Sequence, residues 1–174
     1  IVDPAMADNG KLYTGFDTSF VNEMRNLIGF SDIILPNMTE AGLLTDSEII
    51  LENQTDEYIK DIIYKLKALG AKNIVLKGVK NVEDKLGIAI YEANTDSIDI
   101  FYTDRIKKDA HGTGDCYAAA FTGCLMQGKS LGEAVKVAAE FVSEAILKTV
   151  DDESHWYGVK FEKALPVLIR ELNK

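Results

Sequence analysis

The chain has 174 residues, of which 47% are hydrophobic and 3 are proline, so it is long enough to bury a core without disulfide or metal support. Its 28 acidic residues outnumber its 19 lysines and arginines, and the net charge of −9 argues against a surface for nucleic acid or anionic membrane. No apolar run reaches the roughly 18 residues of a membrane span, no secretory signal is recognisable, and the two cysteines suit a reducing compartment, so we expect a cytoplasmic protein.

The first residues predict a buried strand that leads into a loop. Ile1, Val2 and Asp3 form this strand, and Pro4 ends it because proline lacks an amide donor. The loop continues to Gly10. Because neither an initiator Met nor a lead-in precedes the strand, we expect that part of the polypeptide lies upstream of Ile1.

Capping residues and apolar spacing predict three helices in the first half of the chain. In the third of these helices, acidic residues early and lysines late agree with the helix dipole. The expected helices run from Asp17 or Thr18 to Gly29, from a Thr39 cap through Leu44, and from a Thr55 cap to Gly70.

Apolar runs between these helices predict strands at residues 32–36 and 73–77, followed by a strand pair at residues 86–91 and 98–102 near a sheet edge. Strands that alternate with helices indicate an α/β layered fold with a mostly parallel sheet. Ligands of such folds bind at the carboxyl ends of the strands, and we expect Asp3, Asn37 and Lys77 at such ends.

The second half predicts three further helices. A helix rich in small residues runs to Met126 and should be packed in the core, because it is apolar nearly all round. Ser130 and Glu133 form a capping box for the next helix. The last helix contains Pro166, which we expect to kink it. With no linker or repeat in the sequence, residues 1–174 are predicted to form a single α/β unit.

The residues that carry the most chemistry are Gly112-Thr113-Gly114-Asp115, directly before the small-residue helix. The two glycines let the backbone approach a ligand closely, and the free amides of a helix N-terminus favour an anion. Asp115 could accept a proton from an alcohol beside that anion, which is the arrangement of phosphoryl transfer. The alternative is an ordinary loop with a capping aspartate.

Polar residues near the expected strand ends are candidates for the rest of a phosphate site. Asn37 and Glu40 offer hard oxygen ligands suited to hydrated Mg²⁺, or are a turn residue and a surface acid. Asp3 and Asp8 could help with metal and phosphate, or could be solvated turn residues. Lys77 is a phosphate contact or an exposed lysine. His111, next to the glycine-rich turn, could lie beside the phosphates, and His155 with Trp156 more simply packs in a loop.

A second glycine-rich stretch, Gly123 to Ser130, matches the Walker A pattern letter for letter. That motif requires a preceding strand and a free loop. Here it falls on the end of an apolar helix, with Gly128 as the stop and Ser130 as the next cap, so we expect it to have no role in nucleotide binding.

Four motifs in this order resemble the ribokinase-like superfamily, and more closely its pyridoxal (pyridoxine, pyridoxamine) kinase branch. The likeness covers essentially all 174 residues. Gly-Thr-Gly-Asp before a helix of small residues is typical of the superfamily, while the first motif favours the vitamin B6 branch. The motifs are Asp-Pro-Ala-Met-Ala-Asp at 3–8, Asn-Met-Thr-Glu at 37–40, Lys-Gly at 77–78 and Gly-Thr-Gly-Asp at 112–115.

The resemblance implies a ribokinase-like layered fold and transfer of the ATP γ-phosphoryl group to a hydroxymethyl group of a B6 vitamer. Asp115 would be the general base, and the amides of Gly112, Thr113 and Gly114 would form the anion hole. Catalysis would then depend mainly on positioning and charge stabilisation.

The remaining implied roles belong to residues of the first half. Asn37 and Glu40 would support Mg²⁺, with Asp8 and Asp3 near the metal and phosphates, and Lys77 on a nucleotide phosphate. The full-length protein would act on ATP and a small vitamer, as a homodimer.

Two departures from the family matter. Ala7 stands where members usually carry Gly. Members also have a long segment before the Asp-Pro loop, which resembles the part that forms the vitamin pocket, the lid and much of the dimer interface. We therefore expect this chain to be the C-terminal, nucleotide-binding portion, with the N-terminal part missing, and inactive alone.

Two rival functions stay open. A hydroxymethylpyrimidine (phosphate) kinase of thiamine synthesis would share the fold and nucleotide site, although that branch tends to have Cys where this chain has Asp115. A catalytically silent nucleotide-binding module is the second rival.

Overall fold

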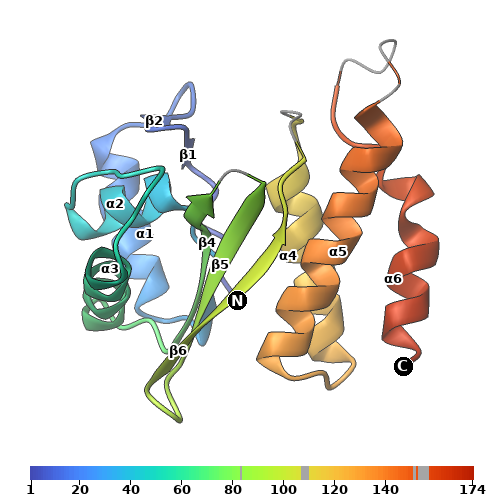
Figure 1. The fold of residues 1–174 in the computed structure, drawn as a ribbon. Coiled ribbons are helices and arrows are strands. Elements are labelled where there is room, and N and C mark those ends of the chain that lie inside the picture. The colour runs from blue at the N-terminus through green and yellow to red at the C-terminus, as the bar shows by residue number, and fades with distance from the viewer. Residues whose placement is uncertain (83, 107–109, 151, 153–156) are drawn as a thin grey trace. The chain divides into compact units, whose positions relative to one another are not determined.

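The computed structural model describes residues 1–174 except positions 83, 107–109, 151 and 153–156 (Figure 1). The chain divides into two compact units, Ile1–Tyr102 and Thr103–Lys174, and each is described by itself. The expected single α/β unit stays a prediction. Among the described residues, no helix combines the length and the apolar character needed to cross a membrane.

Strands and helices alternate in the first unit, which confirms the α/β fold with helices flanking a sheet. Helices α1, α2 and α3 lie on one side of the sheet in Figure 1, and their apolar faces share a buried core with β3, β4 and β5. In chain order the elements are β1 (Ala7–Asp8), β2 (Lys11–Leu12), α1 (Thr18–Ile28), β3 (Ile33–Ile34), α2 (Met38–Thr45), α3 (Asp56–Ala68), β4 (Asn73–Val82), β5 (Lys85–Glu92) and β6 (Ser97–Asp104).

The sheet has the strand order β3-β4-β5-β6 and mixed pairing. β3 is parallel to β4, whereas β5 is antiparallel to β4. The expectation of a mostly parallel sheet is therefore right only for the β3–β4 pair. β4 also continues past Lys77, where we expected its end, because β5 pairs with it through register shifts around Val79. The pair β5 and β6 lies toward one edge, as predicted.

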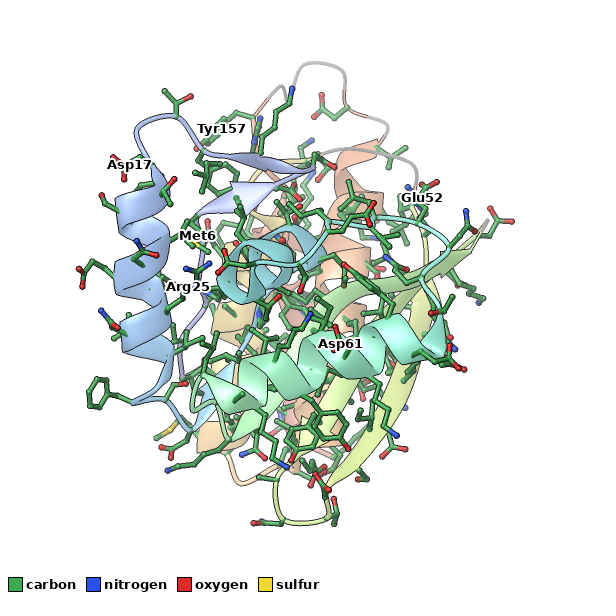
Figure 2. All side chains as sticks on the ribbon, turned by 90° about the vertical axis from the view of Figure 1, so that its left-hand side faces the viewer. Met6, Asp17, Arg25, Glu52, Asp61 and Tyr157 are labelled. Carbon is green, nitrogen blue, oxygen red and sulfur yellow. The ribbon has the colours of Figure 1, made fainter. Side chains whose placement is uncertain are left out.

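Local capping explains the helices of this unit. Asp17 caps α1 by accepting the amides of Ser19 and Phe20, and Thr55 caps α3 by accepting the amide of Tyr58. Arg25, labelled in Figure 2, reaches from α1 to the end of α2, where its guanidinium donates to the carbonyls of Leu43 and Leu44 at 2.6 and 2.7 Å. These contacts satisfy carbonyls that the helix leaves without partners.

Three expectations for the first forty residues are corrected. Residues 1–3 form no strand: Val2 makes an isolated parallel bridge to Ile34, and Ile1 is half exposed. The loop to Gly10 contains the β1–β2 hairpin. Thr39 is not the cap of α2, because Asn37 accepts the Glu40 amide and is the N-cap.

The second unit is helical: α4 (Thr113–Met126), α5 (Leu131–Val150), a short 3₁₀ helix (Phe161–Lys163) and α6 (Leu165–Leu172). The helix α5 pairs with both α4 and α6 (Figure 1). α4 is less enclosed than we expected, since Met126 is 79% exposed.

The helix boundaries of this unit test two further predictions. The Ser130–Glu133 capping box is confirmed, with the Ser130 amide donating to the Glu133 carboxylate at 2.8 Å. Pro166 lies in the first turn of α6 and begins that helix instead of kinking it, because the first turn needs no amide donor there. The Walker-like stretch is the end of α4, a left-handed Gly128 and the start of α5, as predicted.

Candidate functional site

The structure brings Asp3 and Lys77 together at the end of the parallel part of the sheet. Parallel bridges join Val2 to Ile34 and Asn37 to Lys77, so the three segments leave the sheet at the same side. The Lys77 ammonium lies 3.2 Å from the Asp3 carboxylate, and both side chains are less than one fifth exposed, at 18% and 19%. This largely buried ion pair brings Asp3 and Lys77 together on one side of the sheet. The predicted strand ends are only partly right: Asn37 follows β3, but Lys77 lies within β4 and Asp3 follows no strand.

Glu40 lies beside this pair and is 2% exposed. One carboxylate oxygen accepts the Asn37 amide at 2.8 Å, and the other accepts the Met6 amide at 3.2 Å. Burial raises the pKa of Glu40 to about 7, although both amides and Lys77 favour the ionised form; Asp3 adds to the rise. Both carboxylate oxygens of Glu40 already accept backbone amides. Glu40 is therefore better suited to contact an ion such as Mg²⁺ through the ion's water shell than to bind it directly.

Both polar atoms of the Asn37 side chain also contact the backbone. Its oxygen accepts the Glu40 amide at 2.9 Å, and its nitrogen donates to the Ala7 carbonyl at 2.8 Å. Together with Glu40 it forms a capping box that starts α2. In the observed contacts, the two residues that were predicted to support Mg²⁺ therefore hold the β1 segment against the start of α2.

Asp8 is exposed on the β1–β2 hairpin, and its carboxylate accepts the backbone amide of Asn9 at 2.8 Å. The described residues hold no group of three or more side chains that could bind a metal ion. Asp3, Asp8 and Glu40 therefore form no such group. The metal roles of these residues stay predictions.

The second unit holds the glycine-rich turn. Gly112 adopts a left-handed conformation with φ 77° and is the N-cap of α4, without a side-chain hydrogen bond to the helix amides. Among the described residues, none has an atom within 4 Å of a Cβ atom built at Gly112 or Gly114. The first amides of α4 have no partners within the helix, which is the property expected of an anion site.

Asp115 is exposed in this first turn, as predicted. The next residue, Cys116, has its thiol pKa raised, first by burial and then by the Asp115 charge, so it is held as a neutral thiol. The role of Asp115 as the general base stays a prediction.

Tyr157 is a neighbour of the turn that the sequence did not point to. Its ring stacks on His111, with centroids 6.0 Å apart and planes 27° from parallel. At the adjacent Gly158, with φ 72°, an added Cβ atom would lie 3.8 Å from the His111 carbonyl oxygen. His155 and Trp156, which drew attention in the sequence, lie outside the described residues.

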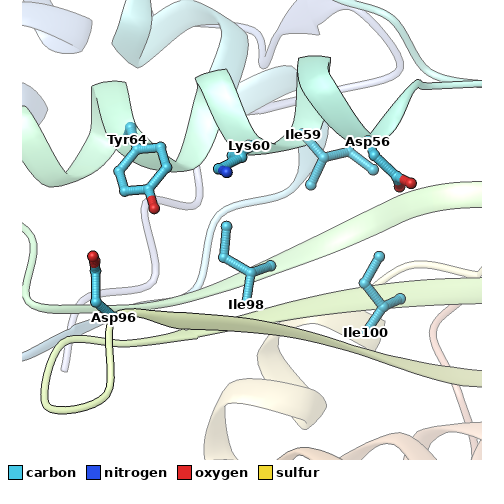
Figure 3. Close-up of a pocket in the computed structure, with 7 residues that line it drawn as sticks. All are labelled: Asp56, Ile59, Lys60, Tyr64, Asp96, Ile98 and Ile100. Carbon is cyan, nitrogen blue, oxygen red and sulfur yellow. The ribbon is translucent and has the colours of Figure 1, made fainter.

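The first unit also contains a hollow of about 420 Å³ between α3 and β6 (Figure 3). Ion pairs engage the carboxylates at its two ends, Asp56 with Lys80 and Asp96 with Lys67. None of the predicted site residues lines it. The lining residues are Asp56, Ile59, Lys60, Tyr64, Asp96, Ile98 and Ile100.

With this geometry established, comparison with known proteins identifies the family. A family model described as phosphomethylpyrimidine kinase matches residues 1–159, which is most of the chain. The chain belongs to the phosphomethylpyrimidine kinase family. The ribokinase-like resemblance agrees with this membership.

Relatives of this family carry two kinds of name. A hydroxymethylpyrimidine/phosphomethylpyrimidine kinase of Bacillus subtilis is 33% identical over 150 residues, which are 86% of this chain and 54% of that protein. A putative phosphomethylpyrimidine kinase of Bacteroides thetaiotaomicron, solved in a form with pyridoxal, is 33% identical, with a TM-score of 0.88 over 96% of this chain and 59% of that one. The pyridoxal kinase of Lactobacillus plantarum is 29% identical, with a TM-score of 0.84 over 98% and 61%. The chain thus spans between half and two thirds of the length of these relatives.

Proposed function

We propose that the protein containing this chain transfers the γ-phosphoryl group of ATP to a hydroxymethyl group of pyridoxal, pyridoxine or pyridoxamine. The observation that carries the proposal is the first turn of α4, where helix amides without partners in the helix lie beside the exposed carboxylate of Asp115. The amides of Gly112, Thr113 and Gly114 stabilise the transferred group, and Asp115 accepts the proton of the attacking alcohol.

The first unit supplies the residues that hold nucleotide and metal. Lys77 contacts a nucleotide phosphate, and Asp3 and Asp8 lie near Mg²⁺ and the phosphates. Asn37 and Glu40 act through the water shell of the ion, which is consistent with the amide contacts of both side chains. Bound Mg²⁺ neutralises phosphate charge, and the chain's own residues orient the reactants.

Two observations favour a B6 vitamer as the acceptor. Asp115 occupies the position at which the hydroxymethylpyrimidine branch tends to have Cys. The Bacteroides relative, although described as a putative phosphomethylpyrimidine kinase, has a solved form with pyridoxal. Hydroxymethylpyrimidine is the second candidate, favoured by the family model and by the names of the relatives found by sequence.

The test is a coupled assay of ADP release by the complete protein that contains this chain, with Mg²⁺ and each acceptor in turn. We expect kcat/KM to be at least about tenfold higher for a B6 vitamer than for hydroxymethylpyrimidine. The reverse preference would establish the second candidate. Absence of turnover with every acceptor, despite ATP binding, would establish a silent nucleotide-binding module.

A further inference from the structure

The first turn of α2 is bonded to the β1–β2 hairpin by three side chains that lie 29 to 34 positions away in the sequence. Each bond joins a side chain of α2 to a backbone group of the hairpin segment. The bonds run from the Met6 amide to Glu40 at 3.2 Å, from Asn37 to the Ala7 carbonyl at 2.8 Å, and from the Gly10 amide to the Thr39 hydroxyl at 3.0 Å.

The third bond involves the tip of the hairpin. Asn9 and Gly10 have φ of 48° and 78°, and Asp8 pairs with Lys11, which is the geometry of a two-residue type I′ turn. The ladder of such a hairpin pairs the residues that flank the turn, so the amide of Gly10 is left for another acceptor. The Thr39 hydroxyl is that acceptor.

Thr39 is an unusual choice for its position. It is the second residue of α2 and is 1% exposed, where an apolar side chain would avoid the cost of burying a hydroxyl. It does not cap its own helix, because Asn37 does. The bond to Gly10 compensates the buried hydroxyl, so the side chain serves the hairpin instead of α2.

We propose that Thr39 is a positioning residue that fixes the Asn9–Gly10 turn and, through it, the Asp8 carboxylate. Asp8 depends on this turn because its carboxylate accepts both the backbone amide and the side-chain amide of Asn9, at 2.8 and 3.3 Å. The inference rests on the proposed function, in which Asp8 lies near Mg²⁺ and the nucleotide phosphates.

The first measurement is amide hydrogen exchange of Gly10 by NMR in the 174-residue chain. Thr39→Val keeps the branched shape and removes the hydroxyl, and we expect Gly10 to exchange about tenfold faster, as loss of one hydrogen bond implies. Thr39→Ser should restore slow exchange. Thr45→Val is the matched control: Thr45 lies in the same helix, and its hydroxyl contacts Ala41 and Ser47 instead of the hairpin.

The second measurement is calorimetric titration of the same four proteins with ADP and Mg²⁺. Thr39→Val should weaken Mg²⁺-dependent binding by about threefold or more, with Thr39→Ser and Thr45→Val close to the wild type. Unchanged Gly10 exchange in Thr39→Val, or faster exchange with unchanged binding, would overturn the proposal. If the folded wild-type chain binds no nucleotide, the proposed function fails, and with it the role of Thr39 in binding; the exchange of Gly10 still decides separately whether Thr39 holds the turn.

Discussion

Asp115 combines exposure with a place in the first turn of a helix whose first amides have no partners within the helix. A carboxylate there can take a proton without being committed to a cap, since Gly112 leaves the helix start without a side-chain bond. The neighbouring thiol of Cys116 stays neutral because its pKa is raised. At the scale of single residues, the proposed chemistry therefore depends on Asp115.

We expect Asp115→Asn to lower phosphoryl transfer by about 10²- to 10⁴-fold in the complete protein, because the amide cannot act as a base. ADP binding should change by less than about twofold, since the backbone amides remain. Steady-state ADP release and calorimetry measure the two effects. Glu162→Gln, an exposed change on the 3₁₀ helix, is the control, and an unchanged rate in Asp115→Asn would reject the base assignment.

Glu40 predicts a pH dependence of stability. Its folded pKa of about 7 is above the ordinary glutamate value of 4.5, so the folded state binds the extra proton between these pH values. The free energy of unfolding should therefore rise as pH falls from about 8 to 5, by on the order of 2 kcal/mol.

Urea unfolding of the 174-residue chain at several pH values checks this expectation. Glu40→Gln should remove most of the rise, because glutamine does not titrate. The nearest charged groups, Asp3 and Lys77, stay in place in that variant. An equal rise in wild type and variant would assign the effect to other groups.

At the scale of elements, local chemistry was predictable and long-range pairing was not. The caps Asp17 and Thr55 act on amides two or three residues away, so their helices follow from the sequence. The extent of β4 depends on β5, and the expected end at Lys77 was therefore wrong. The β1–β2 hairpin was missed although Asn9-Gly10 is a strong hairpin signal.

The candidate site likewise combines features that the sequence predicted with features that depend on long-range contacts. The rule that ligands bind at the carboxyl ends of parallel strands led us to expect Asp3, Asn37 and Lys77 at strand ends. Bridges do join their segments, but Lys77 lies within β4 and Asp3 follows no strand. The buried state of Glu40 and the Thr39 bond to Gly10 could not be predicted, because both depend on how the hairpin folds onto α2. The place of His111 beside the phosphates stays a prediction, and its observed partner Tyr157 could not be predicted because it is distant in the sequence.

The β4–β5 pair predicts one sharp effect on stability. A Cβ atom at Gly87 would lie 2.2 Å from the Val79 carbonyl oxygen, which is backbone and cannot move aside cheaply. We expect Gly87→Ala to lower the free energy of unfolding by about 2 kcal/mol or more. Gly123→Ala, in α4 where an added Cβ meets nothing within 4 Å, should raise it by about 0.5–1 kcal/mol. Thermal or urea unfolding compares the two, and equal effects would contradict the close approach.

At the scale of the whole molecule, the chain spans 54% of its Bacillus subtilis relative yet carries every motif assigned to nucleotide and metal. It is acidic, with a net charge of −9, so attraction to a polyphosphate must come from local groups. Under the proposed function, the amides at the start of α4 and the Lys77 ammonium would be such groups, and Mg²⁺ would add to them. Nucleotide binding should therefore depend steeply on Mg²⁺.

The most direct test is calorimetric titration of the folded 174-residue chain with ADP, with and without Mg²⁺. The proposed function predicts saturable binding of one nucleotide per chain that is lost when Mg²⁺ is chelated, and weakened when Lys77 is changed to Ala. A chain that is folded by circular dichroism and binds no nucleotide in the presence of Mg²⁺ would contradict the assignment of the nucleotide site to these residues.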